Sequence, residues 1–475
     1  TNLAITTFEN NVPTTEFYNL GNAIQNSNTH NINTSLSMET LYKYVGLTKK
    51  STKGNRSAVP SRRSAVPSGL DSKDQGGKDI KAEDDQPDLS APNSNAKGPG
   101  AAKANAQAKS SNSIGTKAFN TAVDILTMVK RVQINYTENN GTFLPGYLNT
   151  PGFIGTMKPT FGYTFGSQSD IRDMVARNGW LTVYPDFNEQ YLENTTQILE
   201  VSANLEVIRD LKIDLNGGRM YSRNLTENFT GIDDNGDGLS DSYDHQIVNT
   251  FGNFNISTAL IKTAFTKSDE VQSLAFEDFR ANRLVVANRL AREFYGNSNY
   301  AVDPEGYPLG FGKNSQNVLI PSFISAYQGT NSENVKLGAF RDIPIPNWQL
   351  KYTGFMKMAW FKKNFKRFSV THGYRSSYTI NQFRTNLDFV AGDPTRSYED
   401  QDVEVLNQSG DFKNQTLFSN INLEEQFSPL VRLDFEMKNS VKILTEIKKD
   451  RILSLSFDNN LMTEIQGKEY IFGLG

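Results

Sequence analysis

The stretch WQLKYTGFMKMAWFKKNFKRFSVTHGYRSSYTI, residues 348–380, decides the predicted fold. Every second residue from Trp348 to Trp360 is apolar or glycine, and most residues between them are polar. A period of two residues is the signature of a β-strand. A basic turn follows, and the alternation resumes from Phe368 to Ile380. We therefore expect a hairpin centred on Asn364, whose two apolar rows share one face.

The length of this stretch indicates what the apolar face contacts. Trp348 and Trp360 would lie about 40 Å apart along a strand, or about 30 Å along an axis to which the strand tilts by roughly 40°. This spacing predicts one indole near each interface of a bilayer, with lipid on the apolar side and water on the other. The alternative is a long hairpin in a soluble β-sandwich.

The composition is compatible with a membrane barrel. Hydrophobic residues make up 37% of the 475 residues, mean hydropathy is -0.52, and no run of eighteen apolar residues occurs. Because barrel strands alternate between apolar and polar residues, an average over the chain does not reveal them. We predict an all-β membrane protein, part of a large antiparallel transmembrane β-barrel with long loops and a few short helices.

Charge and residue types exclude several classes of function. The formal net charge is -3, with 49 basic and 52 acidic residues, so no basic excess indicates a nucleic-acid partner. No cysteine is present, which removes thiol chemistry, disulfides and cysteine-ligated metals. The three histidines, His30, His245 and His372, are too scattered to favour a zinc site or a catalytic triad. We expect no catalytic residues and no enzyme.

The composition along the chain predicts five regions. Residues 51–113 are dominated by Ser, Lys, Ala, Gly, Pro and Asp and contain almost no large apolar side chain, which is typical of a disordered linker. The chain ends in the alternating residues Tyr470, Phe472 and Leu474, so we expect a segment of a longer protein. The predicted regions are a barrel strand with a polar segment and short helix (1–50), a disordered low-complexity linker (51–113), barrel strands with a calcium-like loop (114–265), a helix-containing insertion (266–346) and barrel strands (347–475).

Further elements follow from the same periodicities. The cleanest alternation predicts a hairpin over residues 199–215 with a turn at 208–210, followed by a long polar loop at 219–247. The other expected elements are a short helix at 39–47, strands at 31–38, 132–136 and 161–165, an amphipathic helix at 268–294 capped by Ser268, one more membrane crossing at 317–328, and four successive strands after residue 418 with turns at 438–440 and 448–450.

The strongest local motif lies within the predicted polar loop. The sequence DDNGDGLSDSYD, residues 233–244, places oxygen ligands at the positions of a calcium loop and glycine at its sixth position. Asp replaces the usual bidentate Glu at the twelfth position. We predict a structural calcium site, against the alternative of a solvated Asn/Asp/Gly turn. Its expected ligands are Asp233, Asn235, Asp237, the carbonyl of Leu239, Asp241 and Asp244.

Several runs resemble one protein family. The runs YLNTPGF (147–153), NWQLKYTG (347–354), FSVTHGYRS (368–376) and YIFGLG (470–475) are similar to the SprA/Sov family, and the likeness covers most of residues 114–475. That family forms the giant outer-membrane barrel of the type nine secretion system and gliding machinery of Bacteroidetes.

The resemblance implies a function that periodicity alone does not. It implies a protein-conducting translocon in the cell outer membrane, which exports protein cargo and is surrounded by outer-membrane lipid. It also implies two partners at a lateral opening: a PorV-like outer-membrane protein and a plug protein. Two alternatives remain: a nutrient-transporter barrel, and a secreted or surface calcium-stabilised β-rich adhesin.

Overall fold

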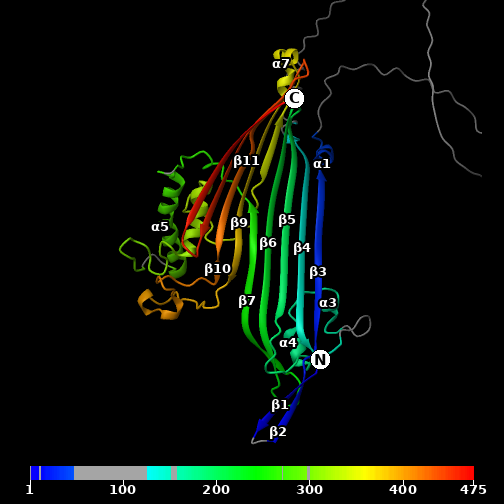
Figure 1. Cartoon of the computed structure of the whole chain (residues 1–475), viewed down its shortest axis with the longest axis vertical. Helices are drawn as coiled ribbons and strands as arrows, with labels where there is room; N and C mark the ends of the chain where they lie inside the picture. Colours follow the sequence, from blue (N-terminus) through cyan, green and yellow to red (C-terminus); the bar gives the residue numbers. More distant parts are fainter. Residues whose placement is uncertain are drawn as a thin grey trace, which may run out of the picture. The chain divides into compact units, whose positions relative to one another are not determined.

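One antiparallel sheet dominates the chain (Figure 1). The computed structural model describes residues 2–9, 12–47, 123, 126–150, 158–269, 271–296 and 300–475, so the predicted linker at 51–113 lies outside the described residues. The 11-stranded sheet has the order β13-β12-β11-β9-β7-β6-β5-β4-β3, with β10 on β9 and β8 between β6 and β9. The prediction of a mainly antiparallel β-protein with few helices is confirmed.

Most strands are far longer than a membrane crossing of about 9 to 11 residues requires; β6, for example, has 22 residues. The strands of the sheet are β3 (Asn22–Ser37), β4 (Val129–Tyr147), β5 (Tyr191–Ile208), β6 (Leu211–Ile232), β7 (Ser242–Ser257), β8 (Asn347–Tyr352), β9 (Phe365–Thr385), β10 (Thr416–Phe418), β11 (Asn420–Met437), β12 (Lys442–Ser456) and β13 (Met462–Leu474).

The first segment is more ordered than its sequence predicts. The strands β1 (Asn2–Glu9) and β2 (Val12–Asn19) form a separate two-stranded sheet, and β3 starts well before the expected strand at residue 31. These strands are rich in Asn and Thr rather than in alternating apolar residues, so periodicity does not reveal them. The short helix expected after β3 is present as α1 (Met38–Tyr44).

Two strands that are distant in sequence, β7 and β8, lie end to end and occupy one strand position in the sheet. β7 ends at Ser257 and β8 begins at Asn347, and both lie between β6 and β9. Backbone hydrogen bonds join the broken ends, because the Ile345 amide donates to the Ser257 carbonyl at 3.0 Å. The Asn347 side chain accepts a hydrogen bond from the Ser376 amide of β9 at 2.7 Å. Residues 258–346, which we call the helical insertion, therefore leave and re-enter the sheet at one place.

This arrangement corrects the predicted crossing at 317–328. That segment lies in helix α6 (Gln316–Gln328), which is part of the helical insertion. No extra crossing is needed to bring the turns near residues 209 and 364 to the same end, since β7 and β8 together make one passage.

The predicted hairpin over residues 348–380 is correct in its faces and wrong in its register. β8 ends at Tyr352, and the chain then coils through η1 (Gly354–Lys357) and α7 (Ala359–Asn364) before β9. Trp348 pairs with Tyr374 instead of Ile380. The shift is an even number of residues, so both apolar rows still share a face. The aromatic residues of the coiled segment pack on one another, with the rings of Phe355 and Phe361 5.2 Å apart.

Several other boundaries differ from the sequence predictions. Residues 161–165 form helix α3 (Phe161–Thr164) rather than a strand, because Thr160 caps the helix by accepting a hydrogen bond from the Tyr163 amide. The polar loop expected at 219–247 is shorter, since β6 runs to Ile232 and β7 starts at Ser242. The turn at 438–440 is confirmed, with Ser440 at φ 69°. The prediction of a second turn at 448–450 is wrong, because β12 runs through these residues without a break. Three strands, β11, β12 and β13, therefore follow residue 418 where four were expected.

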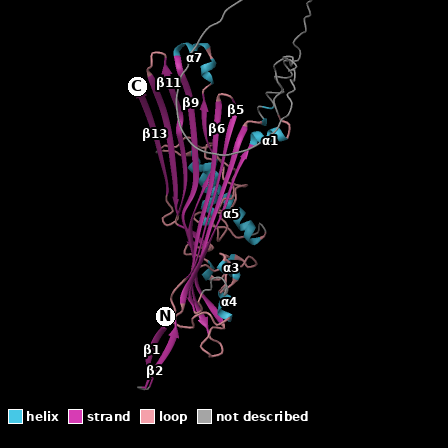
Figure 2. Cartoon of the chain, turned by 90° about the vertical axis from the view of Figure 1, so that its right-hand side faces the viewer, coloured by secondary structure: helices cyan, strands magenta, loops and turns pink. Residues whose placement is uncertain are grey.

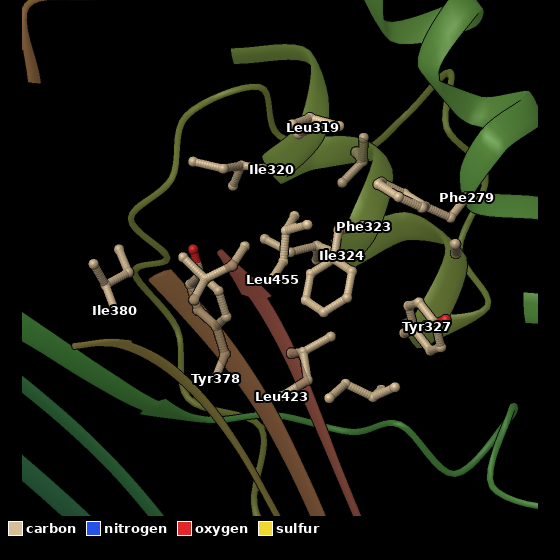
Figure 3. Packing of buried hydrophobic residues seen from close by; sticks show 14 of the residues in the cluster. Phe279, Leu319, Ile320, Phe323, Ile324, Tyr327, Tyr378, Ile380, Leu423 and Leu455 are labelled. Carbon is tan, nitrogen blue, oxygen red and sulfur yellow. The ribbon is translucent and has the colours of Figure 1, made fainter. Parts of the chain in front are cut away.

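Helices cover one end of one face of the sheet (Figures 1 and 2). Helix α5 (Leu274–Tyr295) starts after Ser273 rather than Ser268, and Val271, which lies within the predicted helix, precedes α5 and is 93% exposed. α5 and α6 pack on β7, β9, β11 and β12 through a shared core. Figure 3 shows Phe323 and Ile324 of α6 facing Tyr378, Leu423 and Leu455 of the sheet.

A smaller core holds the β4–β5 connection, which contains α3 and α4 (Arg172–Arg177). Tyr147, Leu181 and Phe229 are fully buried in it. The short 3-10 helices η2 (Tyr398–Asp400) and η3 (Val403–Val405) lie in the long connection between β9 and β10. No helix among the described residues is both long and apolar enough to cross a bilayer.

Candidate functional site

One face of the sheet carries a continuous apolar band. Cross-strand partners show that its members share a face, because directly opposite residues point the same way: Val201 pairs with Ile134, Leu205 with Ile213, Ile213 with Leu350, Leu433 with Val370, and Ile447 with Tyr470. We define the apolar band by Ile134, Leu199, Val201, Leu205, Ile213, Leu215, Leu350, Val370, Val431, Leu433, Ile443, Ile447, Tyr470 and Phe472.

The apolar band has no second layer among the described residues. None of its side chains is fully buried, and Val431 and Phe472 are 40% and 76% exposed. The helices of Figure 2 pack on the same face beyond one end of the band. A contiguous apolar surface of this extent on a soluble monomer would be costly, so it indicates a surface that contacts something apolar.

Aromatic side chains mark both borders of the band. Near the short turns, the rings of Phe365, Phe368 and Phe435 lie within 5.3 to 5.7 Å of one another. At the other border, Trp348 stacks on Tyr374 with ring centroids 4.4 Å apart. From Phe365 to Tyr374 the strand rises about 30 Å. At a tilt of roughly 40° this gives about 23 Å, close to the height of about 25 Å of an apolar membrane band.

The two-tryptophan hypothesis is corrected by this arrangement. Trp360 lies on α7 and is 63% exposed, so it does not continue the strand that begins at Trp348. Tyr374, Tyr378 and Ile380, which were expected to face lipid with the rest of their row, are at most 1% exposed. They lie in a protein core, because β9 is longer than the apolar band and the helical insertion covers its remaining length.

The opposite face carries charged and polar side chains in register with the band. Arg367, Asp434, Arg432, Glu446, Lys448 and Glu469 form an unbroken chain of alternating charge across β9, β11, β12 and β13, with N···O distances of 3.0 to 3.9 Å. On β5 and β6, Asn204 donates to Asp214 at 2.6 Å. We call this surface the polar face. Its charges balance, and all of them except Glu446, whose side chain is 10% exposed, are partly exposed, which is compatible with water on this side.

A buried ion pair fastens the helical insertion to the sheet. Arg451 of β12 contacts Glu425 of β11 at 3.0 Å, and their side chains are 3% and 1% exposed. Arg451 also donates to the carbonyl and the hydroxyl of Thr263, both at 3.0 Å. The Tyr374 hydroxyl donates to Glu425 at 2.8 Å and accepts from the Leu260 amide. The charges are thus compensated, as buried charges must be.

A second buried ion pair fastens α4. Arg172 contacts Glu227 of β6 at 2.6 Å and Asp170 at 2.8 Å, and its guanidinium lies 4.0 Å from the centre of the Tyr191 ring. Burial opposes the charge of Arg172, but Asp170 and Glu227 outweigh it and raise its pKa. Neither ion pair was anticipated from the sequence, since the partners are separated in the chain and belong to no local motif.

The structure brings together only part of the predicted calcium loop. Asp233 accepts hydrogen bonds from the amides of Gly236 at 2.7 Å and Gly238 at 2.8 Å. The Asp241 carboxylate accepts from Asn235 at 3.3 Å, and Asp237 accepts from the Leu239 amide. The amide of Gly238, followed by those of Gly236 and Asp237, lowers the pKa of Asp233.

Asp244 lies apart from this cluster, within β7 opposite Thr230. No group of three or more His, Asp or Glu side chains is arranged to hold a metal within the described ranges. Hydrogen bonds within the loop join Asp233, Asn235, Asp237, Leu239 and Asp241, so calcium binding at these residues stays a prediction. The buried hydroxyl of Ser240 donates to the Ala176 carbonyl at 3.0 Å, which ties the loop to α4.

The histidines have structural surroundings. His245 is hydrogen bonded to Glu227, the partner of Arg172 in the second buried ion pair. His372 contacts the Leu430 carbonyl through Nδ1 at 2.7 Å. His30 lies in β3.

No protein-family model matches the sequence, and none of the curated proteins with which it was compared matches it.

Proposed function

We propose that this chain forms part of the wall of a very large β-barrel in the outer membrane, whose lumen conducts exported proteins. The apolar band contacts lipid, and the polar face lines an aqueous interior. The observation that carries the proposal is the pairing of these two surfaces through one sheet. No second layer covers the apolar band among the described residues, and its height is close to that of a membrane's apolar region. The row of alternating charges lies on the opposite face of the same strands.

The size of the barrel is supported by the sheet edges. In the described part of the chain, β3 and β13 each have a partner strand on one side only. Further strands are therefore required to close the barrel, and its diameter is larger than the strands of this sheet alone would give. The interior of such a barrel is wide enough for a polypeptide.

Protein export itself is supported by the resemblance to the SprA/Sov family. On this basis we assign the chain to type nine secretion and gliding motility, with exported protein as cargo. We also expect a PorV-like protein and a plug protein as partners at a lateral opening. The β5–β6 and β11–β12 connections are short and lie at one end, and the β4–β5 and β9–β10 connections at the other end are long. The connection from β3 to β4, residues 38–128, is an exception, because it leaves from the end with the short turns.

The experiment that tests this proposal uses the absence of cysteine from the chain. Leu205→Cys and Asn204→Cys are labelled with a nitroxide in protein reconstituted into liposomes. Relaxation by oxygen, which concentrates in lipid, should dominate at position 205, and relaxation by a water-soluble nickel chelate should dominate at position 204. Continuing the series through residues 199–207 should give a two-residue alternation. Uniform access to the nickel chelate would refute the lipid assignment.

A second function is favoured by two observations. The Asp233–Asp241 loop and the two helix-covered cores are features that a calcium-stabilised surface adhesin would also have. An adhesin would leave residues 199–207 accessible to the nickel chelate on both faces, so the same experiment separates the two functions.

A further inference from the structure

A polar hollow of 490 Å³ lies outside the apolar band, at the end of the sheet opposite the turns at 209 and 438–440. It forms where the start of α6, the end of β9, the loop 407–414 and the turn 457–460 converge. Its volume falls within the range of small-molecule sites. Side-chain amides supply much of its lining, including Asn314, Gln316, Gln382 and Asn414.

The rim of this hollow, which we call the amide pocket, is held in a fixed conformation. The Asn407 side chain accepts hydrogen bonds from the amides of Ser409 at 2.9 Å and Asp411 at 3.0 Å. The Tyr398 hydroxyl donates to the Gly410 carbonyl at 2.8 Å. Phe412 anchors the loop in the core formed with α5 and α6. A rigid rim reduces the entropy that a ligand must overcome on binding.

Strand addition by a peptide is blocked at this site. The free edge of β10 exposes the Thr416 carbonyl and the Phe418 amide, which are the groups that an added strand would use. The Gln316 side chain occupies both: it donates to Thr416 at 2.9 Å and accepts from Phe418 at 2.8 Å. The amide pocket therefore presents side chains to a ligand, and not a backbone edge.

The remaining polar groups match hydroxyl groups. The Asn414 Oδ1 atom is buried and has no hydrogen-bond partner among the described residues, so it can accept from a ligand once the side chain turns toward the hollow. Gln382 and Arg384 are exposed on the wall as donors, and Asp458 adds an acceptor. A sugar hydroxyl donates one hydrogen bond and accepts others, so it satisfies such a mixed set.

The charges and the apolar surface of the lining limit the chemical class of the ligand further. The lining holds one basic residue, Arg384, and two acidic residues, Asp411 and Asp458, so its formal net charge is at most -1, which disfavours a strongly charged ligand. Phe418 and Phe457 provide apolar surface for the C–H face of a sugar ring. We propose that the amide pocket binds an uncharged oligosaccharide. This site lies outside the apolar band and the polar face, so it does not depend on the proposed transport function.

The test is calorimetric titration of the full chain, folded in detergent micelles, with maltotriose, cellotriose and chitotriose. At least one trisaccharide should bind saturably with one site per chain. The variant Gln382→Ala/Arg384→Ala should weaken that binding by at least about tenfold, since it removes hydrogen bonds to a charged and a polar group. Both side chains are exposed, so their truncation leaves the fold intact.

Asn381→Ala is the matched control. Asn381 is exposed on the same strand but is not part of the lining, so binding should stay within about twofold of the parent chain. Failure of all three sugars to saturate, or equal binding by the double variant, would overturn the proposal. Reduced, carboxymethylated α-lactalbumin serves as a polypeptide probe. Its binding, lost in the double variant while no sugar binds, would overturn the oligosaccharide assignment in favour of a peptide.

Discussion

The two halves of the sheet use the same sequence pattern for different surroundings. In β9, Val370 belongs to the bare apolar band, whereas Tyr378, further along the same row, is 1% exposed beneath α6. The band contacts no second layer among the described residues, while the covered half contacts two helices (Figure 3). Alternation therefore identifies which side chains share a face, but not whether that face contacts lipid or protein.

The halves also differ in where they place their charges. The covered half buries the Arg451–Glu425 pair between the sheet and the helical insertion. In the band half, the ion pairs lie on the polar face and are partly exposed, as for Arg432 and Asp434 at 39% and 31%. A single substitution should thus have very different costs in the two halves.

The largest effect is expected from Arg451→Met. It leaves the Glu425 carboxylate buried without its partner, which typically costs about 3 to 5 kcal/mol. The helical insertion should then detach. The side chain of Lys267 is already exposed, but the backbone around it would become mobile enough for trypsin to cleave in the otherwise folded chain. Limited digestion followed by mass spectrometry measures the cleavage. Arg432→Met on the polar face is the control and should cost about 1 kcal/mol or less. Equal cleavage in both variants would remove the distinction between the two halves.

A somewhat smaller effect is expected from Leu205→Arg in the apolar band. A cation on a lipid-facing strand near the midplane costs about 2 to 4 kcal/mol. Urea titration of the chain folded into liposomes measures this loss. Asn204→Arg, on the next residue, should be nearly neutral, because the new guanidinium can reach Asp214, the present partner of Asn204. Similar losses at both positions would show that the two faces meet the same solvent.

These expectations define how far the sequence could predict the molecule. The hairpin around Arg209 was predictable, because Leu205 and Ile213 alternate cleanly and the turn allows one register. The register of β8 on β9 was not predictable, because Met356, Met358 and Trp360 continue the period of two although the chain has left the strand for η1 and α7. Apolar residues at every second position therefore do not distinguish a strand from two short helical turns such as η1 and α7.

The functional surfaces were predictable in one respect and not in another. The alternation of apolar and polar residues predicted the apolar face of β5 and β11. It could not show that β7 and β8 occupy one strand position, because their junction at Ser257 and Asn347 is a tertiary contact. The Asp233 to Asp241 cluster was visible as a local motif. The amide pocket draws Gln316, Arg384 and Asp458 from distant segments, so no sequence signal could have assembled it.

Calcium should stabilise only the covered half. For a dissociation constant of about 0.1 to 1 mM, typical of extracellular sites, 10 mM calcium would add about 1.4 to 2.7 kcal/mol. Protection of the loop and of α4 from proteolysis should rise together, since Ser240 links them. Asp233→Asn and Asp241→Asn should abolish this gain. Asp244→Asn should keep most of it, because Asp244 lies in β7. An equal gain in the double variant Asp233→Asn/Asp241→Asn would place any bound calcium elsewhere.

The smallest effect, also confined to the covered half, concerns pH. Burial raises the pKa of Asp411, whose carboxylate accepts a hydrogen bond from the Gly312 amide. The folded state therefore holds this proton more tightly than the unfolded state. The resulting stabilisation is complete below the unfolded pKa of about 3.9 and is lost as pH rises through the folded pKa. Hydrogen exchange of residues 386–415 should be slower at mildly acidic pH than at neutral pH, after correction for the intrinsic exchange rate. Asp411→Asn should flatten this dependence, whereas exchange in the hairpin of residues 199–215 should follow the intrinsic rate alone in both proteins.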